Sequence, residues 1–165
     1  MKRSRLAILV AMGALAIPAA AVLAHDATIY GTEGDDYLPG HEHADEIHGR
    51  GGQDNIKGFE NGDKLYGMDG DDINVEGNAG QDIVRGGNAT DWVRGSAGDD
   101  DVEGNAGGDI VTGGADNDTI SGNEGNDTLN ADDGYFDHVW GGGGGDDACR
   151  VDLLIDDING CEWTG

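Results

Sequence analysis

Aspartate recurs along this sequence at an almost constant spacing of nine residues. Carboxylates are hard oxygen ligands, so a regular series of them suits a hard metal cation. The recurring residues are Asp36, Asp45, Asp54, Asp63, Asp72, Asp82, Asp91, Asp100, Asp109, Asp118, Asp127, Asp137 and Asp147. Glutamate never takes one of these places. An acidic surface that serves solubility alone would not require this strict choice, so the pattern indicates a site with defined geometry.

Two further residue types share the period. Glycine stands at positions 31, 40, 49, 58, 67, 77, 86, 95, 104, 113 and 122, and taking it as the first place puts aspartate at the sixth. The eighth place is apolar: Leu38, Ile47, Ile56, Leu65, Val75, Val84, Val93, Val102, Val111, Ile120, Leu129, Val139 and Cys149. The sequence thus contains about thirteen nonapeptide repeats, with one-residue slips near Ile73, Phe136 and Gly141.

Each repeat combines a short strand with a glycine-rich turn. In Asn55-Ile56-Lys57 one apolar residue lies between two polar ones, which is the period-two pattern of a strand. The preceding Gly49 to Asp54 is rich in turn formers, and glycine permits positive φ at little steric cost. One unit cannot bury its single aliphatic side chain, but stacked units can. We therefore predict a solenoid of three-residue strands joined by six-residue turns.

The charge of the chain favours a divalent cation between the turns. There are 34 acidic and 9 basic residues, a formal net charge of -25. Stacked carboxylates repel one another unless a cation lies between them. Ca²⁺ takes six to eight oxygen ligands, which turn carbonyls and aspartates can supply together. The same acidity argues against binding to nucleic acid or to anionic membrane surfaces.

The repeat resembles the calcium-binding nonapeptide of the RTX (repeats-in-toxin) family, G-G-x-G-x-D-x-U-x. A representative copy is Gly104-Asn105-Ala106-Gly107-Gly108-Asp109-Ile110-Val111-Thr112. The resemblance covers Gly31 to about Arg150. It implies an all-β, right-handed parallel β-roll, or β-solenoid, with two nonapeptides per coil and several Ca²⁺ ions in the turns.

The resemblance also implies the ligands. They would be the thirteen sixth-place aspartates together with backbone carbonyls of the turns. The carbonyl-bearing turns are those at Gly31, Gly34, Gly49, Gly52, Gly67, Gly70, Gly104, Gly107, Gly122 and Gly125. More of the odd-numbered repeats than of the even-numbered ones have glycine at the fourth place. We therefore expect calcium to occupy more of the turns on the odd-repeat side of the roll. Sites near His43 and Ala89 are the least regular.

Residues 1–24 differ from the rest of the chain. Lys2, Arg3 and Arg5 precede an uncharged apolar stretch from Leu6 to Ala24, which is typical of a secretory signal peptide. An uncleaved anchor helix is the alternative. We expect residues 25–30 to be a lead-in, 31–150 the roll and 151–165 a C-terminal cap. The mature protein would be extracellular, without a membrane span.

The two cysteines, Cys149 and Cys161, lie near the C-terminus. In an oxidising compartment such a pair most simply forms a disulfide, although two free thiols or half of a metal site are alternatives. The ending is similar to those of short secreted RTX-like proteins. By that resemblance the disulfide would hold a last strand, Leu153-Leu154-Ile155, over the open end of the solenoid.

Two other groups of residues were candidates for function. His41, His43 and His48 could bind zinc or copper, or could simply be surface residues. The outward seventh places Tyr37, Asn55, Ile73, Trp92, Ile110 and Thr128 could form a partner-binding stripe, or could be ordinary exposed residues of a sheet.

The sequence therefore predicts a secreted, non-enzymatic calcium-binding protein that acts as a structural or interaction module. A protein or surface partner is possible, but the sequence does not identify one. The alternative function is an ice-binding or adhesive surface on a calcium-ordered solenoid.

Overall fold

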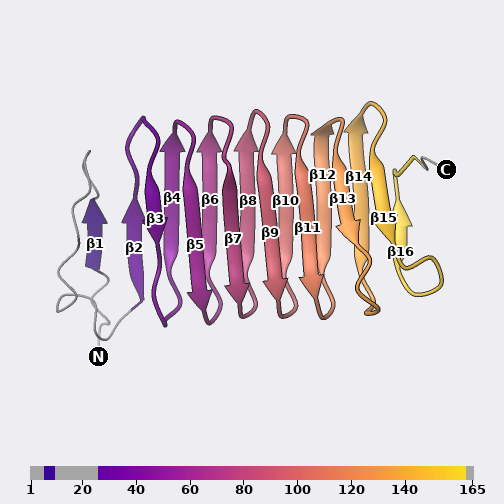
Figure 1. Ribbon diagram of the computed structural model, residues 1–165, viewed down its shortest axis with the longest axis horizontal. Helices are drawn as coiled ribbons and strands as arrows, with labels where there is room; N and C mark the ends of the chain where they lie inside the picture. Colours follow the sequence, from indigo (N-terminus) through magenta and orange to yellow (C-terminus); the bar gives the residue numbers. More distant parts are fainter. Residues whose placement is uncertain (1–5, 10–25, 163–165) are drawn as a thin grey trace.

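The computed structural model describes residues 6–9 and 26–162, and the regular structure in these residues is entirely β. The strands stack side by side along one long axis (Figure 1). No helix is present in the described residues, and so none that could cross a membrane. The predicted signal peptide lies outside the described residues except for Leu6–Leu9, which forms β1 and pairs in parallel with β2.

From β2 onward, successive strands alternate between two parallel sheets. The nine-stranded sheet contains β1 (Leu6–Leu9), β2 (Ala27–Tyr30), β4 (Glu46–Gly51), β6 (Lys64–Asp69), β8 (Ile83–Asn88), β10 (Asp101–Ala106), β12 (Thr119–Gly125), β14 (His138–Gly144) and β16 (Asp157–Asn159). The seven-stranded sheet contains β3 (Tyr37–Pro39), β5 (Asn55–Glu60), β7 (Asn74–Ala79), β9 (Trp92–Ala97), β11 (Ile110–Ala115), β13 (Thr128–Ala131) and β15 (Ala148–Val151). This arrangement confirms the predicted parallel β-roll with two nonapeptides per coil.

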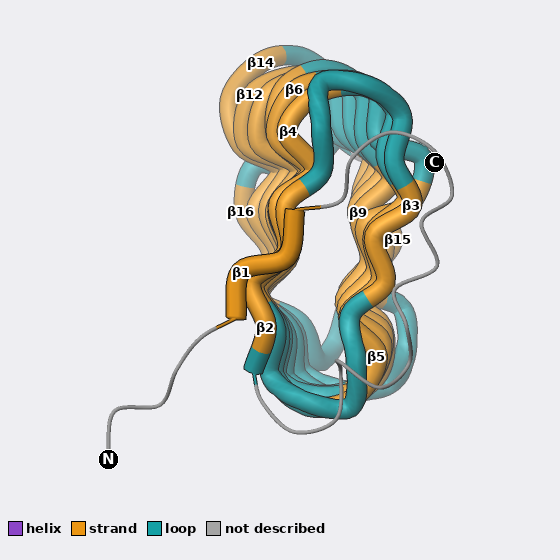
Figure 2. The backbone as a smooth tube through the Cα atoms, turned by 90° about the vertical axis from the view of Figure 1, so that its left-hand side faces the viewer, coloured by secondary structure: helices purple, strands orange, loops and turns teal. Residues whose placement is uncertain are grey.

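The core is a single layer of eighth-place side chains between the two sheets. Viewed along the axis, the sheets face each other and turns close both edges (Figure 2). Equivalent residues stack in register: Ile47 pairs with Leu65, and Leu65 pairs with Val84. The eighth-place residues from Leu38 to Val139 are at most 2% exposed. Each coil therefore buries its apolar side chains against those of the coils above and below.

The strands are longer than predicted. Those from β4 to β11 have six residues, because ladder pairing continues through the first three places of the following repeat. Arg50, for example, pairs with Met68. The chain bends at the second place, where Arg50 has φ 87° and Met68 has φ 85°. The prediction of three-residue strands was wrong because the glycine-rich first three places, which were assigned to the turn, continue the ladder.

The solenoid also continues beyond the repeats recognised in the sequence. At its start, β2 places Ile29 beside Ile47. At its end, β16 places Ile158 beside Val139. The predicted last strand, Leu153-Leu154-Ile155, is wrong: these residues form an exposed turn that is closed by the amide of Ile155 donating to the carbonyl of Asp152. The position of the last strand follows the repeat spacing and not the local hydrophobicity, since Ile158 of β16 occupies an eighth place.

The predicted disulfide between Cys149 and Cys161 is present, with the two Cα atoms 5.7 Å apart. Cys149 belongs to β15 and its side chain packs against the end of the core. The disulfide therefore ties the chain that follows β16 to the last strand of the opposite sheet.

Candidate metal-binding turns

The sixth-place aspartates stand where each turn leads into a strand, and they point into the roll. All of those predicted, except the partly buried Asp36, are at most 3% exposed. They form two rows, one along each edge of the roll, because odd and even repeats turn at opposite ends of the coil. A buried carboxylate is costly unless it is hydrogen-bonded or paired with a charge. Each oxygen of these side chains therefore needs a partner.

One carboxylate oxygen finds its partner in the neighbouring coil. Asp54 donates its backbone N–H to Oδ1 of Asp72 across 2.8 Å, and Asp72 donates in the same way to Asp91. The same bond links successive members of both rows as far as Asp127 to Asp147 and Asp137 to Asp156. This aspartate ladder fixes the stacking of the turns. Sequence reasoning missed it, although the constant spacing was its signal.

The other oxygen, Oδ2, has no hydrogen-bond partner in most turns. The buried and unpartnered oxygens belong to Asp54, Asp63, Asp72, Asp82, Asp91, Asp100, Asp109, Asp118, Asp127 and Asp137. A buried oxygen without a hydrogen-bond partner destabilises the folded state by roughly 1–3 kcal/mol, and by more if it is charged. Ten such oxygens recur at the same place in successive turns, so they are a regular feature of the turns and not a defect of one of them.

The unpartnered oxygens face other oxygens. A Cβ added to the first-place Gly49 would collide with Oδ2 of Asp54 and would lie 2.6 Å from the carbonyl oxygen of Gly67 in the next coil. Gly122 shows the same arrangement with Asp127 and Gly141. The small space beside most first-place glycines is thus lined by a carboxylate and a backbone carbonyl. This donor set suits a hard cation.

Burial changes the acidity of these carboxyl groups. Loss of hydration, to which the carboxylates of neighbouring turns add, raises the pKa of Asp63, Asp91 and Asp118 to about 8. The same causes raise the pKa of Asp54 and Asp109 to about 6. Among the described residues, no Lys or Arg forms an ion pair with any of these five. Each group therefore requires either a proton or a bound cation.

A cation in these turns would depend on backbone oxygens. In the described part of the chain no three His, Cys, Asp or Glu side chains come together as a metal-binding cluster. The suggested zinc or copper site is accordingly not formed: His48 stacks between Tyr30 and Tyr66, and His41 lies 3.5 Å from Asp45. The turns offer calcium-type ligands, not the nitrogen and sulfur ligands of zinc.

The predicted fourth-place glycines divide into two groups. Gly52, Gly70, Gly107 and Gly125 have φ between 108° and 152°, whereas Gly34 does not lie in the left-handed region. Non-glycine residues at this place also adopt positive φ, including Asn61 (72°), Asp116 (80°) and Ala89 (82°). The odd and even rows therefore have the same turn geometry, and the expected difference between them is not visible in the backbone.

The comparison with known families agrees with this geometry. The sequence model of the RTX calcium-binding nonapeptide repeat (4 copies) matches residues 24–56, 76–111 and 103–135, more than half of the chain. The chain belongs to the RTX calcium-binding nonapeptide repeat family. No curated protein and no solved structure matches it. Membership in this family implies that the repeats bind Ca²⁺.

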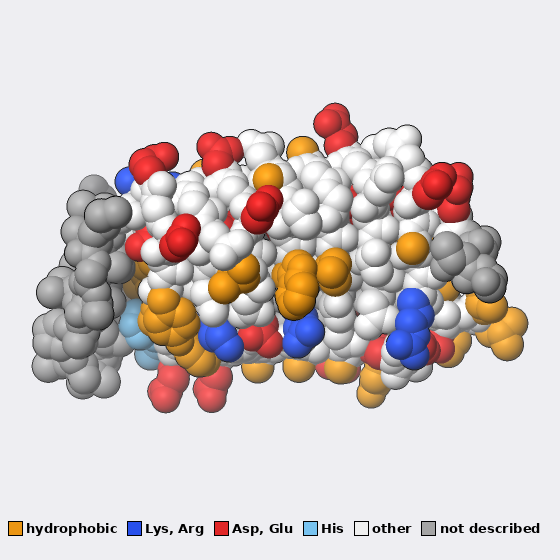
Figure 3. Space-filling view, turned by 45° about the horizontal axis from the view of Figure 1, so that its top comes forward, with side chains coloured by type: hydrophobic (Ala, Val, Ile, Leu, Met, Phe, Trp, Pro, Cys, Tyr) orange, Lys and Arg blue, Asp and Glu red, His pale blue; other side chains and the backbone are white. Residues whose placement is uncertain are grey.

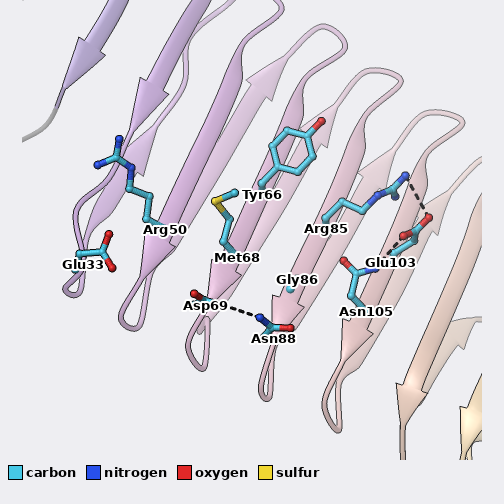
Figure 4. A pocket seen from close by; sticks show the side chains of 11 residues that line it. Glu33, Arg50, Tyr66, Met68, Asp69, Arg85, Gly86, Asn88, Glu103 and Asn105 are labelled. Carbon is cyan, nitrogen blue, oxygen red and sulfur yellow. Dashed lines mark hydrogen bonds and ion pairs between the residues drawn. The ribbon is translucent and has the colours of Figure 1, made fainter.

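The outer surface of this RTX roll carries a groove of about 630 Å³ across β4, β6, β8 and β10 (Figure 4). It opens where Gly87 lacks a side chain between Met68 and Asn105, its partners in the neighbouring strands. Arg85 lines it but already donates to both carboxylate oxygens of Asp101, at 3.2 and 3.0 Å. The central polar groups are directed to one another and do not define a class of ligand.

The predicted stripe of outward seventh places is partly apolar. Tyr37, Ile73, Trp92 and Ile110 are 41–59% exposed, and Trp92 pairs directly with Ile110. On the face shown in Figure 3, hydrophobic side chains form separate patches among polar and acidic ones. The structure places Tyr37, Trp92 and Ile110 on one sheet, whereas Ile73 lies in the bend before β7 and Asn74 pairs with Asn55 in its place. It shows no partner protein for them.

Proposed function

We propose that this protein is a secreted, non-enzymatic calcium-binding module whose ions lie in the turns of the roll. The ligands are the buried sixth-place aspartates, through Oδ2, together with backbone carbonyl oxygens of the glycine-rich turns. One observation carries the proposal: Oδ2 of each aspartate from Asp54 to Asp127 is buried without a partner, and in most of these turns a backbone carbonyl oxygen lines the same space. Family membership supports calcium as the ion.

The two oxygens of each aspartate would have separate tasks. Oδ1 accepts the amide of the previous coil and holds the turns in register, as between Asp91 and Asp109 at 2.9 Å. Oδ2 is thereby oriented toward the space beside the first-place glycine. Bound calcium supplies the positive charge that a buried carboxylate otherwise lacks. The chain's own part is to pre-arrange oxygens and to exclude water from them.

Calcium binding and folding should be coupled in this protein. The core is one aliphatic layer, and the formal net charge is -25. A solenoid of this kind gains its stability from contacts between neighbouring coils, which stacked carboxylates oppose. Since the site exists only when turns are stacked, the free energy of metal binding becomes free energy of folding. A structural or interaction role, for example at a cell surface, fits such a calcium-ordered rod.

Export is supported by two features. Residues 1–24 have the composition of a signal peptide, and the disulfide between Cys149 and Cys161 is typical of an oxidising compartment. The alternative of an ice-binding surface requires a flat array of uniform side chains. The sheet faces instead carry ion pairs such as Lys57 with Glu76 and Arg85 with Asp101.

Equilibrium dialysis of the exported chain against Ca²⁺ tests the proposal. We expect several ions per chain at saturation, and we expect excess Mg²⁺ not to displace them, because Mg²⁺ requires a smaller octahedral site and retains its water. A chain that binds no calcium, or binds Mg²⁺ equally well, would contradict the proposed function.

A further inference from the structure

The turns differ in what contacts the second carboxylate oxygen. In the central turns, which we define as those ending at the sixth-place aspartates from Asp54 to Asp137, Oδ2 has no partner. In three other turns the backbone N–H of the second-place residue donates a hydrogen bond to Oδ2 of the aspartate in the same turn. These bonds are Thr32 N–H to Asp36 Oδ2 (2.6 Å), His41 N–H to Asp45 Oδ2 (2.7 Å) and Asp152 N–H to Asp156 Oδ2 (2.7 Å). We call these three the closed turns.

The backbone of the closed turns differs accordingly. The central turns up to the one ending at Asp127 have positive φ at both their second and fourth places, as at Arg50 (87°) with Gly52 (108°). Neither Thr32 nor Gly34 of the first closed turn lies in the left-handed region, and the same holds for His41 of the second. The whole turn has changed conformation, so that an amide N–H points at the carboxylate. The hydroxyl of Thr32 also donates to Asp36 Oδ2, at 2.9 Å.

The closed turns lie at three of the four ends of the two aspartate rows. Asp36 is the first member of the odd row, Asp45 is the first of the even row, and Asp156 is the last member of the even ladder. The fourth end, at Asp147, keeps positive φ at Gly142 and Gly144. Among the described residues, a turn at the end of a row has a stacked turn on one side only. It can therefore offer a cation fewer oxygens than a central turn, which lies between two others. An amide N–H from the same turn satisfies the carboxylate without a second turn.

We propose, on the basis of the function proposed above, that calcium is confined to the central turns and that the closed turns are metal-independent end caps. In a closed turn the chain's own amide occupies the position that calcium takes in a central turn. Consensus sequence does not reveal this difference. The first closed turn, Gly31-Thr32-Glu33-Gly34-Asp35-Asp36, has glycine at both expected places, and it was predicted to bind calcium.

The proposal predicts different calcium stoichiometries for two matched double variants of the full chain. One carries Asp36→Asn and Asp45→Asn in closed turns, and the other carries Asp91→Asn and Asp100→Asn in central turns. Asparagine retains a ladder acceptor but replaces the other carboxylate oxygen by NH₂. We expect equilibrium dialysis at saturating calcium to give the parental number of ions for the first variant. The second variant should bind at least one ion fewer.

The outcomes separate this proposal from the one on which it rests. A loss of ions in both variants would overturn the end-cap proposal and leave calcium binding intact. The absence of calcium from the parent chain would overturn both. The closed-turn variant places two N–H donors together and could fail to fold. In that case, anomalous scattering from calcium in crystals of the parent chain decides: an ion within 3 Å of the Asp36 or Asp45 carboxylate contradicts the proposal, and ions at the central turns alone support it.

Discussion

The backbone amide of Asp91 donates to Oδ1 of Asp109 across 2.9 Å, from one coil of the roll to the next. The bond leaves Oδ2 of Asp109 buried beside Gly104, without a partner. One side chain thus holds two coils in register and presents an oxygen to the space between them. The constant spacing of the aspartates in the sequence follows from these two roles, because a side chain can perform both only if it stands at the same place in every coil.

Replacement of this aspartate should be costly. We expect Asp109→Ala to raise the calcium concentration at the folding midpoint and to destabilise the calcium-bound chain by about 1–3 kcal/mol, since the amide of Asp91 would lose its acceptor. Glu60→Ala is the control, because Glu60 is exposed at the end of β5. Calcium-dependent circular dichroism and thermal unfolding measure both effects. Equal midpoints for the two variants would refute the role of the sixth place.

The single-layer core makes a second prediction. Ile120→Ala, at a fully buried eighth place, should destabilise the calcium-bound chain by about 2–5 kcal/mol. Ile110→Ala makes the same change at a side chain that is 41% exposed, and should cost within about 0.5 kcal/mol. Chemical denaturation at saturating calcium compares them. Similar losses would show that the core is not confined to the eighth places.

The metal-free protein should depend on pH in an unusual direction. Burial and neighbouring carboxylates raise the pKa of Asp63, Asp91 and Asp118 to about 8 in the folded chain, from an ordinary value of 3.8. The folded state therefore retains protons that the unfolded state has released, so folding is favoured at low pH and loses this contribution as the pH rises from about 4 to about 8.

We expect protein freed of metal at low salt to keep its strand signal in circular dichroism near pH 5 and to lose it above pH 8. In saturating calcium the cation replaces the proton, so the folded signal should persist above pH 8. Greater stability of the metal-free chain at the higher pH would contradict the described burial of uncompensated carboxylates.

Much of this architecture could be predicted from the sequence, because each coil repeats one local pattern. The apolar eighth place of Ile56 and the glycine-rich turn before it specify a strand and a turn on their own. The conformation of Arg50 and Met68 could not be predicted, because neither residue type favours the positive φ that both adopt at the second place. The closed turn at Asp36 was also beyond local reasoning, since its sequence is regular and only its place at the end of a row differs.

The C-terminal end was mispredicted for a related reason. Leu153 to Ile155 is the most apolar stretch after Arg150, yet it forms a turn. Ile158 enters the core position beside Val139, because it stands at the correct distance from Asp156. In a solenoid the repeat spacing overrides local hydrophobicity.

Reduction of the disulfide should loosen the C-terminal coils before the others. The disulfide between Cys149 and Cys161 stabilises the folded chain by about 3 kcal/mol, because it lowers the entropy of the unfolded chain. Cys149 also packs at the end of the core. Because coils contact only their neighbours, damage should spread from that end. Hydrogen exchange in calcium, with and without reductant, should show protection lost first between Asp127 and Ile158. Uniform loss, or none, would argue against a cap.

The central claim is that calcium holds the roll together, and removal of the ion tests it most directly. Far-ultraviolet circular dichroism of the exported chain should be recorded at neutral pH and low salt, first in calcium and then in excess chelator. We predict that the strand signal is lost in chelator and returns cooperatively when calcium is restored. An unchanged spectrum in chelator would contradict the account, because it would show that the stacked aspartates need no cation.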